Sequence, residues 1–492
     1  MNRIRLLAGP GLAIIIWGFF DLEPGKPAVT LMAAIAVWIA VWWMTEAVPL
    51  AATALLPVVL YPLTGVMDGR LVAPLYFNHI ILLFLGGFLV ALAMERWGLH
   101  RRIALRILLV FGSRPGDLLL GFMVATAFLS MWISNTATTM MMVPIAASVL
   151  VTVESDKGKL STGLLLGVAY SASIGGAATL VGTPPNLSFS RILQIQFPGA
   201  PEISFGEWMV FGFPLALTFL LIAWVLIKHQ YVESNDATLD QGALREDYNG
   251  LGCVGPEERS VMVVFVLLAL LWVFRHGIRI GVLDLPGWAS LLPYPSYIND
   301  GVVAIGMALV LFVVPSSQSK SGRVMDWEAA SRLPWHIVLL FGGGFALAQG
   351  FVDSGLSAWL GGQLVGLRTV NPIVLVASIC LLITFLTELT SNTATAEIFL
   401  PILAALALAI DVNPLLLMIP ATLSCSFAFM LPVATPPNAI IFGTDRVRIQ
   451  AMVRTGILLN LIGVAITAFG IVILGPIAFG IDLTTVPTWV SP

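Results

Sequence analysis

A fifteen-residue pattern occurs twice in this chain and constrains its fold more than any other feature. The copies are MWISNTATTMMMVPI at residues 131–145 and ELTSNTATAEIFLPI at residues 388–402, which lie 257 residues apart. Both contain the tripeptide Ser-Asn-Thr within strongly apolar sequence. An unpaired polar group costs several kcal/mol in hydrocarbon, so such a tripeptide usually has a partner or a function. The pattern predicts a duplicated fold with one polar tripeptide in each half.

The composition places the chain in a membrane. Of its residues 58% are hydrophobic and only 10% are charged, whereas a soluble domain carries about 25% charged residues. The net charge of −3 and the lack of a basic cluster mixed with aromatic residues give no sign of a nucleic acid partner. The three cysteines are odd in number and far apart, so they predict neither a disulfide framework nor a metal site. We expect an all-α polytopic membrane protein.

Apolar runs near 20 residues long predict about 11 transmembrane helices. They lie near residues 6–22, 27–45, 47–66, 79–95, 161–181, 207–227, 260–274, 300–314, 336–352, 414–434 and 455–480. The two segments around the tripeptides do not fit this count. Each arm of residues 116–153 and 372–410 is shorter than the membrane core, because a helix rises about 1.5 Å per residue and the core is about 30 Å thick. We therefore predict two re-entrant helical hairpins with the tripeptides at their tips.

Two further motifs repeat in the same order. HIILLFLGGF at residue 79 recurs as HIVLLFGGGF at residue 336, and the Thr-Pro-Pro-Asn sequence at 183–186 recurs at 435–438. The glycines of the first motif are expected to permit close helix packing. An odd number of expected crossings separates the copies, so the repeat should be inverted across the membrane. The predicted parts are an N-terminal helix (1–26), a first inverted repeat (27–230), a polar cytoplasmic linker (231–258) and a second inverted repeat (259–492).

The distribution of basic residues predicts the orientation. Under this topology, 18 of the 24 Lys and Arg residues fall on the side of the N-terminus. Cytoplasmic segments carry the excess of these residues in membrane proteins. The N-terminus is therefore expected in the cytoplasm and the C-terminus outside, in a multi-pass protein of the cell membrane.

The repeated motifs predict a site for an anion together with cations. A Pro-Pro pair must interrupt a helix, because proline lacks an amide hydrogen and clashes with the preceding turn. The interruption frees carbonyl groups, which suit an alkali cation, and exposes a helix N-terminus, which suits an anion. A dianion alone in low dielectric would cost tens of kcal/mol. Bound cations would supply the missing charge, which favours coupled transport.

These motifs resemble the divalent anion/sodium symporter (DASS) family, which includes the bacterial dicarboxylate transporters of the INDY type. The match covers nearly the whole chain, with both Ser-Asn-Thr hairpins, both Pro-Pro breaks and TEAVPLAATALLP at residues 45–57. The resemblance implies a homodimer, in which a mobile part of each protomer carries its site across the membrane by an elevator mechanism. It also implies sodium as the coupling ion and no organic cofactor.

The resemblance further implies which residues bind sodium and substrate. One sodium site would comprise Ser130, Ser134, Asn135 and the backbone of Gly182, and the other Thr387, Thr390, Asn392 and the backbone of Ala434. Substrate would meet the tripeptides and the start of each break, at Asn135, Thr136, Thr183, Pro184, Asn392, Thr393, Thr435 and Pro436. The spacing is compatible with this assignment, since Ser130 lies four residues before Ser134 and therefore faces the same side of a helix.

Several alternatives remain open at this point. The tripeptide serine can be a helix cap that satisfies free amides. The favoured function is sodium-coupled symport of succinate, malate or fumarate; sodium-independent exchange, or transport of citrate or sulfate, are the alternatives. A hydrolase is disfavoured because no His or paired Asp accompanies the tripeptide serines. Glu46 and Glu388 are expected to be interfacial or inter-helix partners, and Glu397 is either satisfied by a neighbouring helix or couples transport to a proton or cation.

Overall fold

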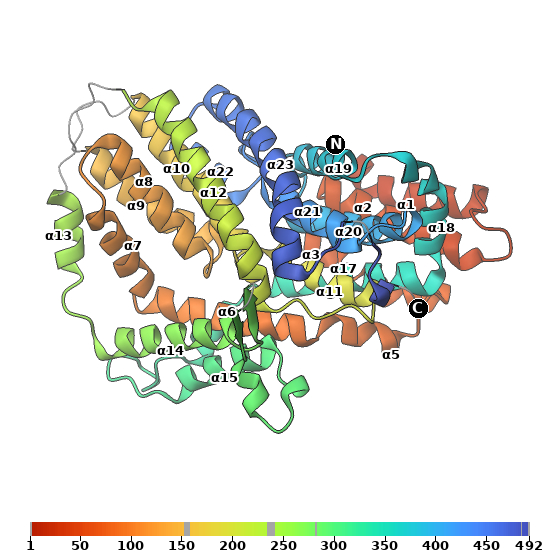
Figure 1. Cartoon of the computed structure of the whole chain (residues 1–492), viewed down its shortest axis with the longest axis horizontal. Helices are drawn as coiled ribbons and strands as arrows, with labels where there is room; N and C mark the ends of the chain where they lie inside the picture. The colour runs from red at the N-terminus through yellow and green to blue at the C-terminus, as the bar shows by residue number, and fades with distance from the viewer. Residues whose placement is uncertain (1, 152–157, 234–241, 281–282, 484, 491–492) are drawn as a thin grey trace.

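The apolar runs of the chain form a helical protein. The computed structural model describes residues 2–151, 158–233, 242–280, 283–483 and 485–490. Within these residues it contains 23 α-helices and one antiparallel pair of short strands, β1 (Ile278–Ile280) and β2 (Leu283–Leu285) (Figure 1). The all-α prediction is therefore confirmed except for this small hairpin.

The first half of the chain contains twelve helices. Their bounds are α1 (Asn2–Phe19), α2 (Pro27–Thr45), α3 (Leu50–Thr53), α4 (Leu56–Thr64), α5 (Gly69–Val72), α6 (His79–Arg96), α7 (Leu99–Val110), α8 (Pro115–Ser130), α9 (Asn135–Val151), α10 (Lys159–Gly176), α11 (Pro184–Gln196) and α12 (Phe205–Tyr231). A 3-10 helix, η1 (Ala73–Tyr76), precedes α6. The first tripeptide lies at the start of α9.

The last seven helices of the second half repeat the order of α6–α12. Its helices are α13 (Gly242–Gly250), α14 (Pro256–Val273), α15 (Asp300–Val313), α16 (Trp327–Ala330), α17 (Trp335–Ser354), α18 (Leu356–Leu364), α19 (Pro372–Thr387), α20 (Asn392–Ala409), α21 (Pro414–Ser426), α22 (Pro436–Phe442) and α23 (Ile449–Phe479). Four 3-10 helices accompany them, η2 (Trp288–Leu291), η3 (Pro295–Tyr297), η4 (Val365–Thr369) and η5 (Thr488–Val490). The second tripeptide lies at the start of α20.

Six helices in the described part of the chain are long and apolar enough to cross a membrane. They are α2, the run Gly69–Arg96, α12, α17, α20 and α23. Shorter apolar helices include α8, α15, α19 and α21, so the count of 11 spans stays a prediction. Two expected spans are interrupted. Residues 47–66 divide into α3 and α4, because Pro57 in the first turn of α4 starts a new helix, and the helix expected at 414–434 ends at Ser426.

The polar linker contains a helix that packs against the first half. Within residues 231–258, α13 lies against α7. The guanidinium of Arg102 on α7 donates to the Glu258 carboxylate at 2.6 Å and to the carbonyl oxygens of Leu251 and Gly252. The structured part of the linker is therefore anchored to α7. Residues 234–241 of the linker and 152–153 of the first hairpin lie outside the described residues.

The two halves exchange the helices that follow their Pro-Pro breaks. The first-half helix α11 packs against α20 and α21 of the second half, and the second-half helix α22 packs against α9 and α10 of the first. Between these groups α12 packs against α23, as Figure 1 shows near the centre of the molecule. Each hairpin is therefore covered in part by the broken helix of the other half.

The packing of the two halves differs at one place. Helix α17, which carries HIVLLFGGGF, packs against α20 and α11. Its repeat partner α6, which carries HIILLFLGGF, packs mainly against α15 and α14 and has no extensive contact with α9 among the described residues.

Glycines make the close contacts of both helices, as predicted. A Cβ atom on Gly86 would lie 2.5 Å from the Cβ of Ala304, and one on Gly343 would lie 2.6 Å from the Cβ of Ala54.

Candidate functional site

Both Thr-Pro-Pro-Asn sequences interrupt a helix. Helix α10 ends at Gly176 and α11 begins at Pro184, while α21 ends at Ser426 and α22 begins at Pro436. In each case the threonine is the extended N-cap residue and the first proline follows it. Proline suits this position because its missing N–H would have no partner in the first turn. The predicted breaks are therefore confirmed.

The asparagine of each break holds the interrupted segment in place. The amide nitrogen of Asn186 donates to the carbonyl oxygens of Gly176 (3.4 Å) and Thr179 (2.8 Å). The equivalent Asn438 donates to the carbonyl oxygens of Ala428 and Leu431, both at 3.1 Å. Both side chains are fully buried. No role was predicted for these two residues from the sequence, although their recurrence beside each Pro-Pro pair was a signal for one.

The first tripeptide tip gathers oxygen atoms around the Asn135 amide. The amide atom that faces Ser130 lies 2.6 Å from the serine Oγ, 3.1 Å from the carbonyl oxygen of Ala172 and 3.3 Å from that of Gly182. If this atom is the nitrogen, it donates hydrogen bonds to all three. If it is the oxygen, it accepts from the Ser130 hydroxyl and lies beside two carbonyl oxygens, which is a set of oxygen atoms of the kind that binds a cation. Three of the four residues predicted for the first sodium site therefore meet here.

Ser134, the fourth residue of that predicted site, is engaged elsewhere. Its hydroxyl oxygen accepts a hydrogen bond from the backbone N–H of Ala137 at 3.2 Å, which is the capping arrangement considered above. Gly182 needs its lack of a side chain, because a Cβ atom there would lie 2.4 Å from the carbonyl oxygen of Gly176. The close approach of these two glycines brings the Gly182 carbonyl to the tip.

The second tripeptide tip has the same hydrogen bonds. The hydroxyl of Thr387, at the end of α19, lies 2.8 Å from the Asn392 amide oxygen and 3.0 Å from the carbonyl oxygen of Cys425. In the first half, the corresponding residues are Ser130, Asn135 and Ala172. Thr390 instead bonds to Thr395 at 2.7 Å. Thr387 and Asn392 therefore meet as predicted, whereas no hydrogen bond joins Thr390 or Ala434 to them.

One contact joins the two copies of the site. The hydroxyl of Thr183, the buried N-cap of α11, lies 3.3 Å from the hydroxyl of Ser426 at the end of α21. Ser426 adjoins Cys425, whose carbonyl accepts the bond from Thr387. Thr183 adjoins Gly182, whose carbonyl faces Asn135. A continuous series of contacts therefore connects the two tripeptides.

The remaining predicted substrate residues lie around these contacts. Thr393 and Thr435 are buried, and the Thr435 hydroxyl accepts from the backbone N–H of Asn438. Thr136 and Pro184 are half-buried, and Pro436 is exposed. Uncharged hydroxyl, amide and carbonyl groups therefore make up the predicted set, and positive charge would come from helix N-termini and cations.

Glu388 caps the second break. Its carboxylate, which is buried, accepts from the backbone N–H groups of Phe429 (2.7 Å), Met430 (2.9 Å) and Leu431 (2.9 Å), and from the side-chain amide of Asn460 (2.8 Å). It is thus an inter-helix partner, as expected. Glu46, by contrast, is exposed at the end of α2. The first half has Met131 at the position of Glu388, and there the Met131 carbonyl accepts from the hydroxyl of Thr179.

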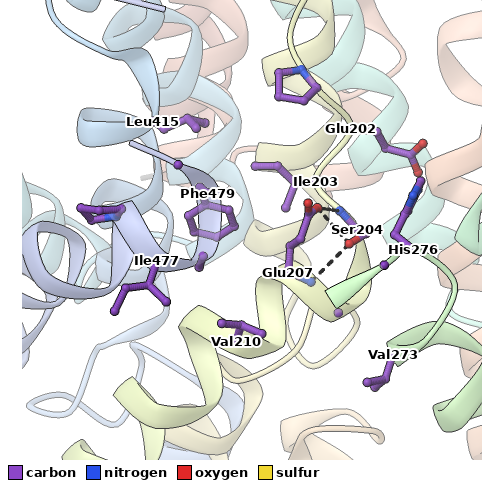
Figure 2. A pocket seen from close by; sticks show the side chains of 16 residues that line it. Glu202, Ile203, Ser204, Glu207, Val210, Val273, His276, Leu415, Ile477 and Phe479 are labelled. Atoms are coloured by element: carbon purple, nitrogen blue, oxygen red, sulfur yellow. Dashed lines mark hydrogen bonds between the residues drawn. The ribbon is translucent and has the colours of Figure 1, made fainter. Parts of the chain in front are cut away.

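A cavity of about 730 Å³ lies away from the tripeptides. Figure 2 shows it between the start of α12, the end of α14 and the end of α23. Its lining includes none of the predicted site residues and carries two carboxylates, Glu202 and Glu207. The Glu207 carboxylate accepts from Ser204, the N-cap residue of its own helix, and Glu202 pairs with Arg275 at 2.9 Å. Burial raises the pKa of Glu202, which Arg275 partly offsets. Among the described residues, the lining of this cavity holds no Lys or Arg side chain that could bind a dianion.

The apolar helices, the paired broken helices and the connected tripeptide tips define a multi-pass membrane transport protein built from a duplicated unit. Residues 23–480 match the family described as "Sodium:sulfate symporter transmembrane region". The chain belongs to this family, which confirms its resemblance to the divalent anion/sodium symporters. Membership places it among transporters and not among enzymes.

Curated relatives cover nearly the whole chain. It is 41% identical to the sodium-dependent dicarboxylate transporter SdcS of Staphylococcus saprophyticus over 98% of this chain and 93% of that one. It is 42% identical to the protein of the same name from Staphylococcus aureus, over 98% and 92% of the two chains. A solved structure, that of the YdaH transporter from Alcanivorax borkumensis, is similar in fold, with a TM-score of 0.53 at 14% identity over 92% of this chain and 98% of that one.

Proposed function

We propose that this protein is a secondary active transporter that carries small C4 dicarboxylates, such as succinate, malate or fumarate, into the cell together with sodium. The single observation that carries this proposal is the series of contacts from Asn135 through Thr183 and Ser426 to Asn392. It links two tips, each rich in uncharged oxygen atoms, across the boundary between the halves. The names of the curated relatives, which describe sodium-dependent dicarboxylate transport, support the choice of ion and substrate class.

The chemistry of the two tips fits sodium as the coupling ion. Hydroxyl, carboxamide and carbonyl oxygens are the hard ligands that alkali cations prefer. The oxygen groups of Ser130, Asn135 and Gly182 would hold one ion, and those of Thr387 and Asn392 the other. Ser134, Thr390 and Ala434 stay in the proposed sites as residues that would have to turn toward the ions. No organic cofactor is proposed.

The substrate would lie between the tips. Its two carboxylates would meet Thr136 and Thr393 of the tripeptides and the N-terminal ends of α11 and α22, where Thr183, Pro184, Thr435 and Pro436 lie. Each helix N-terminus carries about half a positive charge, so two termini supply about one charge and balance a dianion only when sodium is bound beside them. This balance is the physical reason to prefer symport over sodium-independent exchange.

The proposed movement is an elevator motion in a homodimer. The hairpins α8–α9 and α19–α20 would be re-entrant, and they would move with the broken helices past the rest of the protomer. The exchange of α11 and α22 between the halves would keep the two tips together during this motion. The charge bias of the sequence supports a cytoplasmic N-terminus and an external C-terminus.

Uptake of radiolabelled succinate into proteoliposomes tests the proposal. We expect uptake against a succinate gradient when sodium is higher outside, and little uptake when potassium replaces sodium. Sodium-independent uptake that requires internal dicarboxylate would identify an exchanger instead. Unlabelled citrate and sulfate serve as competitors, and stronger competition by either one than by malate would assign the substrate class to that anion.

A further inference from the structure

The carboxyl group of Glu397 has only one hydrogen-bond partner in the described structure. The side chain is fully buried in α20, one helical turn after Thr393. One oxygen, Oε1, lies 2.5 Å from the hydroxyl of Ser188 on α11. The other, Oε2, is buried and has no hydrogen-bond partner. A buried polar atom without a partner requires an explanation.

Helix α17 closes one side of the pocket around this carboxyl. A Cβ atom on Gly344 of α17 would lie 1.8 Å from Oε2, so the glycine leaves the space that the carboxyl fills. The titratable group that interacts with Glu397 is the buried thiol of Cys425 on α21. No charged side chain of the described residues on α2, α11, α17, α18 or α19 forms an ion pair with Glu397 or interacts with it electrostatically.

This environment favours the neutral form of the carboxyl. A charged carboxylate that is buried without a cation costs several kcal/mol, and a single hydroxyl cannot offset that cost. The neutral acid carries no such cost and still bonds to Ser188. The arrangement in which α17 covers α20, called here the docked arrangement, therefore holds a proton on Glu397.

In the first half, the position equivalent to Glu397 is exposed. Met140 stands 257 residues before Glu397 and is 60% exposed, whereas Glu397 is 0% exposed. The difference follows from the packing, since α6 has no extensive contact with α9 among the described residues. In an inverted repeat, alternating access exchanges the arrangements of the two halves. After that exchange α17 would leave α20, and the Glu397 side chain would be exposed as the Met140 side chain is now.

We propose that Glu397 is a proton-binding site that is occupied in the docked arrangement and released when the second hairpin leaves α17. This inference rests on the alternating-access function proposed above. Undocking exposes the acid to water, where a glutamic acid has a pKa near 4.3 and gives its proton to water at neutral pH. Re-docking takes one proton from water onto the carboxylate. The balance between the two arrangements therefore depends on pH, and a higher pH favours undocking.

Thiol labelling of the purified full chain tests this site. In the background Cys253→Ser, Met140→Cys places one accessible thiol on α9, because the other two cysteines, Cys380 and Cys425, are buried. The thiol is exposed in the docked arrangement and covered after the exchange. Its rate of reaction with a maleimide is measured from pH 5.5 to 8.5 with Glu397 intact and with Glu397→Gln, which resembles the protonated acid.

The ratio of the two rates isolates the carboxyl, because thiol ionisation affects both proteins equally. We expect the rate with Glu397 intact, divided by the rate with Glu397→Gln, to fall as pH rises, by up to tenfold per pH unit for one proton. A ratio that is constant over this range would overturn the proposal. The Ser188→Ala variant keeps the Glu397 carboxyl, so it is expected to keep the pH dependence of the labelling rate. If Ser188→Ala loses this pH dependence, the effect belongs to a damaged interface between α11 and α20 and not to the carboxyl.

A second measurement separates this inference from the proposed function. Sodium and succinate are added at constant pH, and the labelling rate is measured again. A change with sodium and succinate but none with pH would contradict the proton site and leave the transporter proposal standing. If neither the ligands nor pH alters the rate, the proposed alternation and the proton site both fail.

Discussion

The carboxylate of Glu388 provides a sharp test of how the second break is held. Three consecutive backbone N–H groups and one side-chain amide donate to it, at distances from 2.7 to 2.9 Å. Glu388→Ala removes this acceptor and leaves the N–H groups of Met430 and Leu431 without a partner, while Phe429 keeps a bond of 3.3 Å to Asn460. A buried donor without an acceptor costs about 1–3 kcal/mol. The side-chain amide of buried Asn460 also loses its acceptor, so the three donors together predict a loss of at least about 3 kcal/mol.

The variant should therefore be less stable and transport poorly. In a chain of 492 residues, a loss of this size lowers the unfolding temperature by on the order of 3 °C or more. Since the same segment leads into Ala434 and Thr435, sodium-dependent uptake should also fall by tenfold or more. Glu388→Gln keeps one oxygen for two of the N–H groups but turns an NH₂ group toward the third, so an intermediate loss of about 1–3 kcal/mol is expected.

Thermal unfolding of the purified protein and succinate uptake in proteoliposomes measure these effects. Glu46→Gln is the matched control, because Glu46 is exposed and should tolerate the change in both assays. If Glu388→Ala unfolds within about 2 °C of the parent and retains full uptake, the carboxylate does not hold the break, and the reasoning from its four donors is wrong.

Three further changes test other parts of the structure. Asn135→Ala should fold normally and yet transport little, as uptake normalised to the amount of inserted protein would show. Gly182→Ala should abolish sodium-dependent uptake because a Cβ atom lies 2.4 Å from a backbone carbonyl, whereas Gly362→Ala, on an open surface, should leave uptake unchanged. Arg96 donates to Asp326 and lowers the pKa of that carboxyl to about 2. This interaction stabilises the folded protein by about 2 kcal/mol at most. The stabilisation is present above pH 4 and is lost toward pH 2. Asp326→Asn should therefore lower the unfolding temperature at pH 7 but not near pH 2.

Local chemistry explains why the breaks and tips could be predicted from the sequence. A Pro-Pro pair interrupts a helix wherever it occurs, so α11 and α22 begin at Pro184 and Pro436 as expected. The repetition of the motifs in both halves gave information that local chemistry alone does not give. Ser130 and Thr387 differ in type but stand at the same distance from their tripeptides, which placed both on the tripeptide side of a helix, and both bond to the tip asparagine.

Long-range packing explains what the sequence did not predict. Glu388 and Glu397 lie nine residues apart in similar apolar sequence, yet one accepts four hydrogen bonds and the other only one. Their partners come from α11, from the break after α21 and from α23, which sequence spacing does not place. The roles of Asn186 and Asn438 were missed for the same reason, since the carbonyl groups they hold become free only in the broken helix.

The departures of one repeat from the other carry information that the shared motifs do not. If the two halves were identical, exchanging their arrangements would cost no free energy, and only sodium and substrate could bias the exchange. The two halves differ where the first has Met140 and the second has Glu397. The proposed exchange therefore moves an ionisable group between a buried pocket and water in the second half only. Met131 and Glu388 differ at another, where a carboxylate fixes the second break through backbone groups that the first half satisfies differently. The two arrangements must therefore differ in free energy even without ligands, and the structure shows the one in which the second hairpin is covered by α17.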